Sequence, residues 1–262
     1  MTGLVHSELS KILTTRLWWG LLIGAAVYAA LQAGVTAGFA GVDPGAGQPG
    51  LPPLDSDETI RSIYATGAFT GAYIFALILG VTGMTAEYRY QTATPTFLAT
   101  PRRARVVVAK AVAHLGVGVG YGLVALLTAL VAGGAVILIR GHDLGLTTPG
   151  LWRAAALAVL AVAVWTLLGL GVGTLIRNQV AAILIAVAIT FLVEPLLGLA
   201  LNALELDTVA KFLPSSASSA MTSPGSVIGE LLPWWGGALV LSGYALLFAA
   251  VGVFLSVRRD IS

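Results

Sequence analysis

Few residues of this chain have the chemistry that catalysis or ion binding needs. The sequence has no cysteine and only three histidines, His6, His114 and His142, which lie far apart along the chain. Disulfides, thiolate catalysis and cysteine-bound metal are therefore excluded, and a histidine metal site is not expected. A Gly-rich phosphate loop that ends in Lys-Ser or Lys-Thr is also missing, so this chain does not bind ATP by that route. We expect no catalytic residue, no metal and no cofactor bound by this chain.

Glu194 stands out because it lies in an otherwise apolar stretch and is followed by Pro195. An ionisable residue inside a membrane-spanning helix is costly and commonly marks an ion or substrate path, and proline interrupts the hydrogen bonds of a helix. Either Glu194 faces a cavity and contacts cationic or polar groups of a substrate, or a helix ends near the outer surface and Glu194 reaches water. Both interpretations stay open, and Asn202 is a second candidate for a substrate path.

A polar segment at residues 87–110 contains the other group of reactive residue types. Its first part holds a carboxylate, an arginine and several aromatic and polar residues: Glu87, Tyr88, Arg89, Tyr90, Thr92, Phe97 and Leu98. Aromatic side chains commonly anchor protein interfaces, and charged side chains can form charge-assisted hydrogen bonds with a partner. A solvated loop held at the lipid headgroups explains the same residues, so composition alone leaves the choice open.

The elements that hold these residues are predicted to be membrane helices. Hydrophobic residues make up 57% of the chain and charged residues 10%, and a soluble domain cannot keep so much apolar surface away from water. About 20 apolar residues cross a bilayer. We therefore expect one all-α transmembrane domain over residues 1–262, with six spans at residues 17–40, 62–86, 111–139, 151–176, 180–201 and 233–257.

Shorter elements are predicted around these spans. The apolar residues of segment 2–15 fall on one helical face, which predicts an amphipathic helix that lies at the membrane interface. Residues 202–232 are mixed, with Pro214, a serine cluster and Pro224, and are predicted to form short surface or re-entrant helices.

Glycines recur at short spacing inside two of the predicted spans. Gly116, Gly118, Gly120 and Gly122 alternate in the third span, and a similar row in the fourth consists of Gly169, Gly171 and Gly173. Glycines four residues apart allow helices to approach closely, so both rows are predicted to be packing surfaces.

Basic residues are unevenly distributed across the predicted membrane. Ten lie on the side of the N-terminus: Lys11, Arg16, Arg89, Arg102, Arg103, Arg105, Lys110, Arg177, Arg258 and Arg259. Four lie on the other side: Arg61, Arg140, Arg153 and Lys211. Because basic residues in short loops stay in the cytoplasm, both termini are predicted to be cytoplasmic. Arginines beside a span suit lipid headgroups, and we expect no nucleic-acid partner.

The residues inside the predicted spans offer no source of energy for transport. His114 and Glu194 are almost the only ionisable residues there, and neither has a partner at helical spacing. An ion-coupled carrier normally has more such residues and paired broken helices. If this chain belongs to an active transporter, its ATPase must therefore be a second polypeptide.

The polar segment resembles the signature of type-2 ABC exporter permeases. The matching positions are Glu87, Arg89, Thr92, Leu98, Pro101, Arg103, Ala109 and Lys110. Residues 7–16 are similar to the amphipathic N-terminal helix of that family, and residues 213–217 are similar to its segment between spans five and six. The similarity is a loose pattern that covers essentially the whole chain.

The resemblance implies a homodimer, or a heterodimer with a similar permease, bound to two cytoplasmic ATPase subunits that hold the ATP and magnesium. Residues 87–100 would form a coupling segment that contacts the ATPase, with Glu8 and Lys11 of the N-terminal helix beside it. Residues 202–232 would lie on the outer side of the translocation path. The expected function is export of an amphiphilic drug, lipid or peptide across a bacterial inner membrane. The alternative is a membrane scaffold or sensor that transports nothing, and an intramembrane enzyme is the least favoured.

Overall fold

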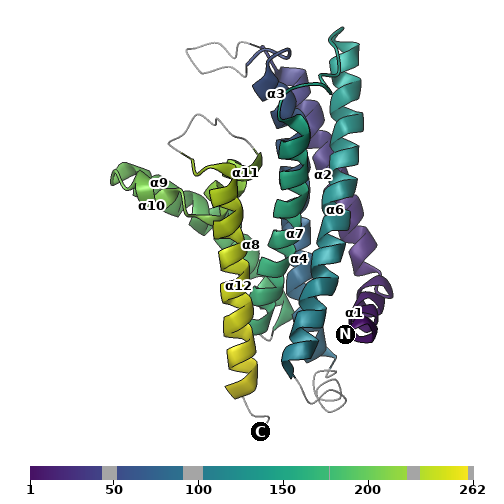
Figure 1. Cartoon of the computed structure of the whole chain (residues 1–262), viewed down its shortest axis with the longest axis vertical. Coiled ribbons are helices and arrows are strands. Elements are labelled where there is room, and N and C mark those ends of the chain that lie inside the picture. Colours follow the sequence, from purple (N-terminus) through teal and green to yellow (C-terminus); the bar gives the residue numbers. More distant parts are fainter. Residues whose placement is uncertain (43–51, 91–102, 177, 223–230, 259–262) are drawn as a thin grey trace.

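Four long helices run side by side and form the centre of the protein in the computed structural model (Figure 1): α2 (Leu17–Phe39), α4 (Gly67–Arg89), α6 (Arg103–Ile139) and α7 (Leu151–Leu175). The structure describes residues 1–42, 52–90, 103–176, 178–222 and 231–258. Helix α1 (Thr2–Leu13) lies beside one end of this bundle and contacts α6. The N-terminal helix is thus attached to the bundle by tertiary contacts.

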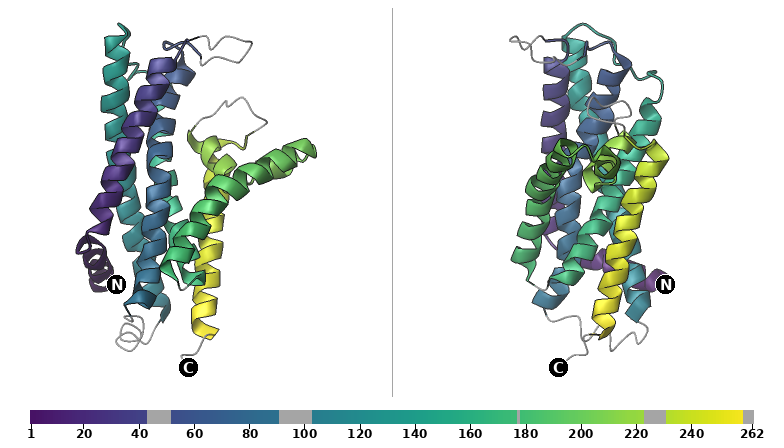
Figure 2. Two further views of the ribbon diagram at one scale, coloured as in Figure 1. Left: turned by 180° about the vertical axis from the view of Figure 1, so that it is seen from behind. Right: turned by 90° about the vertical axis from the view of Figure 1, so that its left-hand side faces the viewer.

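The second half of the chain packs against one side of the bundle. Its first part is a helical stretch made of α8 (Gln179–Ala188), a π-helical turn (Ile189–Val193) and α9 (Glu194–Ala203). Helix α9 and the short α10 (Asp207–Ala210) extend away from the bundle (Figure 2). Helix α11 (Pro214–Thr222) returns to contact α7, and α12 (Trp234–Arg258) then runs toward the end of the bundle where α1 lies.

Five helical stretches are long and apolar enough to cross a membrane: Leu17–Phe39, Asp57–Arg89, Arg105–Ile139, Leu151–Leu175 and Gln179–Ala203. The described residues form helices and no strands, so the prediction of an all-α fold is confirmed, and the five apolar stretches are consistent with a membrane protein. The sixth predicted span falls on α12, and among its described side chains the continuous apolar stretch is Trp234–Phe248. The layout with six spans therefore stays a prediction.

Two of the helices begin earlier than the sequence pattern indicates. The predicted span at residues 62–86 is preceded by α3 (Asp57–Arg61) and a π-helical turn (Ser62–Thr66). The Ser56 side chain caps α3 by accepting a hydrogen bond from the Thr59 N–H at 3.2 Å. The third span was predicted from residue 111, and α6 begins at Arg103, so the helix extends beyond the apolar stretch.

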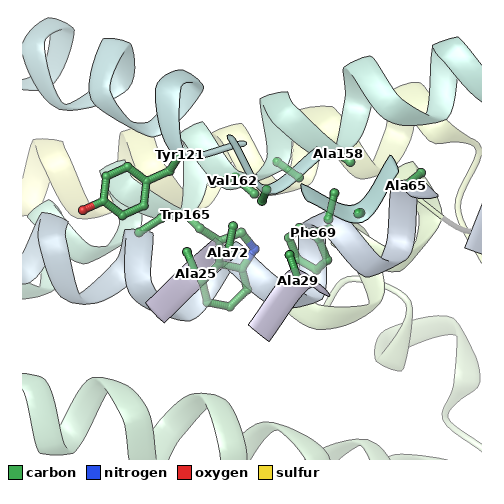
Figure 3. Packing of buried hydrophobic residues seen from close by; sticks show 14 of the residues in the cluster. Ala25, Ala29, Ala65, Phe69, Ala72, Tyr121, Ala158, Val162 and Trp165 are labelled. Atoms are coloured by element: carbon green, nitrogen blue, oxygen red, sulfur yellow. The ribbon is translucent and has the colours of Figure 1, made fainter. Parts of the chain in front are cut away.

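Small residues build the centre of the bundle. Every fourth residue of α2 has no exposed surface, and this alanine stripe consists of Ala25, Ala29, Ala33 and Ala37. Figure 3 shows Ala25 and Ala29 close to Ala72 of α4. A Cβ atom on Gly71 of α4 would lie 2.4 Å from the Cα atom of Ala29. The two helices therefore pack at a distance that only small side chains allow.

The glycine rows pack partly as predicted. In α6, Gly118 and Gly122 lie against α7, whereas Gly116 and Gly120 have no neighbouring atom within 4 Å among the described residues. In α7 every glycine of the row contacts another helix: Gly169, Gly171 and Gly173. One face of the α6 row is therefore a packing surface, and the other is not covered by the described part of the chain.

Candidate functional site

Four charged side chains meet where α1 crosses the ends of α4 and α6. The Lys110 Nζ atom lies 2.5 Å from Glu8 Oε2 and 2.9 Å from Glu87 Oε1. The Lys11 Nζ atom lies 2.6 Å from Glu8 Oε1 and 3.2 Å from Glu87 Oε1. Each carboxylate thus contacts both ammonium groups, and two negative charges match two positive ones. We call Glu8, Lys11, Glu87 and Lys110 the ion cluster.

Three members of the ion cluster are buried. The exposed fractions of Glu8, Glu87 and Lys110 are 5%, 4% and 3%, whereas the side chain of Lys11 is 40% exposed. Burying a charge costs several kcal/mol unless a partner of opposite charge lies beside it. The cluster can therefore exist only while α1, α4 and α6 stay together.

A histidine and a glycine complete the surroundings of the buried lysine. The Lys110 ammonium also donates a hydrogen bond to the Gly83 carbonyl at 3.2 Å. His114 lies one turn further along α6, with Nδ1 2.8 Å from the Lys110 carbonyl oxygen. Its ring occupies the space that a Cβ atom on Gly83 would need. Within the described structure, His114 Nε2 and Glu87 Oε2 are buried without a hydrogen-bond partner.

Electrostatics keeps the two α1 members of the cluster charged. Burial opposes ionisation of Glu8, but the charge of Lys110 and hydrogen bonds from both lysines outweigh it, so the pKa of Glu8 is lowered. Burial likewise opposes the charge on Lys11, but its hydrogen bond to Glu8 and the charge of Glu87 outweigh this effect, so the pKa of Lys11 is raised. Both residues are therefore ionised at neutral pH.

The amphipathic pattern of α1 explains how it reaches this position. Glu8 and Ile12 are four residues apart, so they share one face of the helix, and they are its two buried residues. The buried face thus contains a carboxylate as well as an apolar residue. The pattern of segment 2–15 predicts an interfacial helix, and the structure adds that this helix is ion-paired to the bundle.

The predicted coupling residues divide into two groups at the end of α4. Glu87 points into the ion cluster, and Tyr88 is half-buried. Arg89 and Tyr90 are exposed, with the guanidinium carbon of Arg89 5.7 Å from the ring centre of Tyr90. Arg89 also donates a hydrogen bond to the Gln179 side chain at 3.3 Å, which joins α4 to the start of α8.

The remaining predicted coupling residues, Thr92, Phe97 and Leu98, lie outside the described residues. Lys110 was predicted only as a match to a family pattern, and no spacing rule joins it to Glu8, which is 102 residues away. One feature of the sequence could have indicated this pairing. Lys110 begins an apolar stretch, and burying its charge there is costly unless an acidic partner lies beside it.

The structure places Glu194 in a second polar site, on α9. Its side chain is 7% exposed, and its Oε1 atom accepts a hydrogen bond from the Ser215 N–H of α11 at 3.3 Å. Its Oε2 atom is buried and has no partner among the described residues. Its burial disagrees with the interpretation in which Glu194 reaches water, and its contact with a substrate stays a prediction.

Three aromatic rings from α4, α7 and the π-helical turn before Glu194 lie close to one another. The Tyr73 ring is 5.0 Å from the Trp165 ring and 6.3 Å from the Phe191 ring, measured between ring centres. Trp165 donates a hydrogen bond to Ser218 Oγ of α11 at 2.9 Å. Helix α11 is therefore held by Glu194 at its N-terminus and by Trp165 about one turn further along.

Asn202 is not part of this site. It lies near the end of α9, is exposed, and donates a hydrogen bond to the Asp207 carboxylate at 2.9 Å.

The described residues contain no group of three or more histidine, aspartate or glutamate side chains that could hold a metal ion. No protein-family model matches the sequence, and no curated protein matches it either.

Proposed function

We propose that this chain is the membrane permease subunit of an ATP-driven exporter whose ATPase is a separate cytoplasmic polypeptide. Its substrate is amphiphilic and leaves from the cytoplasm or the inner leaflet. The permease works as a homodimer, or as a heterodimer with a similar chain, in a bacterial plasma membrane with both termini cytoplasmic. This chain has no catalytic role, because ATP and magnesium are bound by the partner.

The ion cluster is the observation that carries this proposal. Residue 87 begins the segment that resembles the coupling segment of type-2 ABC exporter permeases, and its carboxylate is ion-paired to both α1 and α6. A force on the end of α4 is therefore transmitted to two other helices through buried charges. Such a connection suits a protein whose helices are moved from their cytoplasmic ends.

The exposed residues of the same helix end are the proposed contact with the ATPase. Tyr90 is 66% exposed, and exposed aromatic residues that become buried on binding contribute strongly to interfaces. Glu87 acts differently, since it positions α4 against α1 and α6. Loss of Tyr90 should weaken binding of the ATPase, and loss of Glu87 should weaken the coupling of hydrolysis to transport.

Purification together with the products of neighbouring genes tests the proposal. A stoichiometric ATPase should remain bound to the wild-type chain, and Tyr90→Ala should reduce the bound fraction without changing the amount of inserted permease. His142→Ala is the matched control, because His142 is equally a surface residue but lies in the loop at the opposite end of α6. Glu87→Ala should retain insertion but lose stimulation of ATP hydrolysis by substrate.

Two results would contradict the proposal. If Glu87→Ala and Arg89→Ala both keep normal transport-coupled hydrolysis, the coupling assignment is wrong. If the chain alone, in liposomes without nucleotide, moves a solute uphill on an ion gradient, it is not an ATP-driven permease. A scaffold or sensor would bind partners without any substrate-stimulated hydrolysis.

A further inference from the structure

We propose that Glu194, Tyr73 and Phe191 form a binding site for a hydrophobic organic cation, and that the exported substrate belongs to this class. The assignment of the site to transport rests on the proposed function above. Binding of the cation does not, because every residue of the site belongs to this chain and no ATPase is needed for it.

The free oxygen of Glu194 is the first reason. One carboxylate oxygen accepts a hydrogen bond from the N-terminus of α11, and the other is buried without a partner in the described structure. None of the ion pairs between described residues includes Glu194. A buried carboxylate with one free oxygen either takes up a proton or is paired with a positive charge. A bound cation would supply that charge.

The aromatic residues beside Glu194 indicate what kind of cation fits. Phe191 precedes Glu194 by three residues, so the two side chains are neighbours on one helical face, and the Phe191 ring centre is 6.3 Å from the Tyr73 ring centre. Aromatic faces attract organic cations through their quadrupole. Among the described residues, Glu194 belongs to no group of three or more histidine, aspartate or glutamate side chains, and a small metal ion needs several such ligands.

The exposed side of α8 and α9 indicates how the cation arrives. Phe191 is 53% exposed, and the residues that follow it, Leu192 and Val193, are 59% and 49% exposed. All three lie in the π-helical turn, directly before Glu194. A ligand that approaches along this surface must tolerate an apolar environment, so its charge must be attached to a hydrophobic body.

Direct binding of tetraphenylphosphonium to the purified full-length chain tests the inference. We expect saturable binding in equilibrium dialysis, and binding of neutral triphenylphosphine oxide that is at least tenfold weaker. Glu194→Gln should raise the dissociation constant for tetraphenylphosphonium at least tenfold, because the charge-assisted contact is lost. Phe191→Leu should raise it about threefold through loss of the cation–π contact. Glu205→Gln is the matched control, since it removes an exposed carboxylate just beyond α9.

Equal affinity of the wild-type chain for the phosphonium and the neutral oxide would overturn the inference without any variant. Unchanged phosphonium affinity in a monodisperse Glu194→Gln protein would also overturn it. If Glu194→Gln does not fold, Glu194→Asp and Phe191→Leu take its place, and unchanged affinity in both rejects the site. Failure to bind an ATPase would contradict only the proposed exporter, whereas failure here contradicts only the cation site.

Discussion

Lys110 illustrates at the residue scale how a charge is accommodated at the start of an apolar helix. The residue is 3% exposed, and its ammonium group contacts two carboxylates and one carbonyl oxygen. Lys11 contacts the same two carboxylates from a site that is 40% exposed. The two lysines therefore have the same partners but different access to solvent.

This difference predicts unequal effects of the same substitution. Lys110→Met should lower the free energy of unfolding by about 3–5 kcal/mol, because it removes the buried cation and leaves the two buried carboxylates with only the solvent-exposed one. Lys11→Met should lower it by about 1 kcal/mol or less, since solvent screens the exposed charge. Unfolding of the detergent-solubilised protein measures both values. Equal losses for the two variants would show that burial does not determine the strength of the cluster.

The pKa shifts of α1 predict how its attachment depends on pH. The pKa of Glu8 is lowered from its ordinary value of 4.5, so the stabilisation is fully present above that value and is lost as pH falls through the lower folded-state pKa. The pKa of Lys11 is raised from 10.5, so its contribution is fully present below that value and is lost as pH rises through the higher folded-state pKa. Attachment of α1 should thus be constant between these two values.

Spin labels on Ser10→Cys of α1 and Val108→Cys of α6 measure this attachment, because the chain has no other cysteine. Their separation should stay constant from neutral pH down to about pH 4.5 and increase only in stronger acid. In a Glu8→Gln background the labels should already be further apart, or more broadly distributed, at neutral pH. An increase between pH 7 and pH 5 in the unmodified cluster would contradict the lowered pKa of Glu8.

The helices themselves were largely predictable from the sequence, but their ends and contacts were not. Hydropathy locates an apolar helix because each span satisfies its own backbone within lipid. The start of α3 depends on the Ser56 cap, and the pairing of Glu8 with Lys110 joins residues 102 positions apart. The hydropathy and spacing of neighbouring residues do not indicate a pairing between residues so far apart. Helix α11 was likewise expected on a surface or in a re-entrant position, and it packs between α7 and α12.

The close approach of α4 and α7 at Gly80 allows a prediction about how these two helices pack. A Cβ atom on Gly80 would lie 2.0 Å from the carbonyl oxygen of Thr166, so Gly80→Ala must push the two helices apart. We expect a loss of about 1–3 kcal/mol in stability. Gly120→Ala is the control, because no atom of the described structure lies within 4 Å of its Cβ position. It should change stability by about 0.5 kcal/mol or less.

At the scale of the whole molecule, the basic residues lie toward the two ends of the bundle. Lys11, Arg89 and Lys110 lie at the end where α1 packs, whereas Arg61 and Arg140 lie at the opposite end. The sequence alone predicted this separation, because it follows from counting basic residues between apolar stretches. The proposed cation site could be predicted only in part: Glu194 was a candidate from the sequence, but Tyr73 comes from a different helix and has no local signal that joins it to Glu194.

Orientation in the membrane can be tested with single cysteines. A membrane-impermeant thiol reagent added outside intact cells should label His142→Cys and leave Ser7→Cys unlabelled, because the more basic end is expected in the cytoplasm. Both positions are exposed in the structure. After the membrane is made permeable, both cysteines should react. Labelling of Ser7→Cys in intact cells would reverse the proposed orientation and exclude a cytoplasmic ATPase contact at Tyr90.

The alanine stripe of α2 cannot by itself fix the position of this helix along its own axis. Identical side chains at every fourth position offer the same surface after a slide of about 6 Å along the helix axis, so alanine alone cannot fix the axial position of α2. Polar contacts with α6 do so at both ends. The Tyr121 hydroxyl donates a hydrogen bond to the Trp18 carbonyl, and Arg140 donates to the Ala37 and Ala40 carbonyls, each at 2.8 Å. These hydrogen bonds fix the axial position of α2 against α6, so α2 has a single register although its buried face repeats.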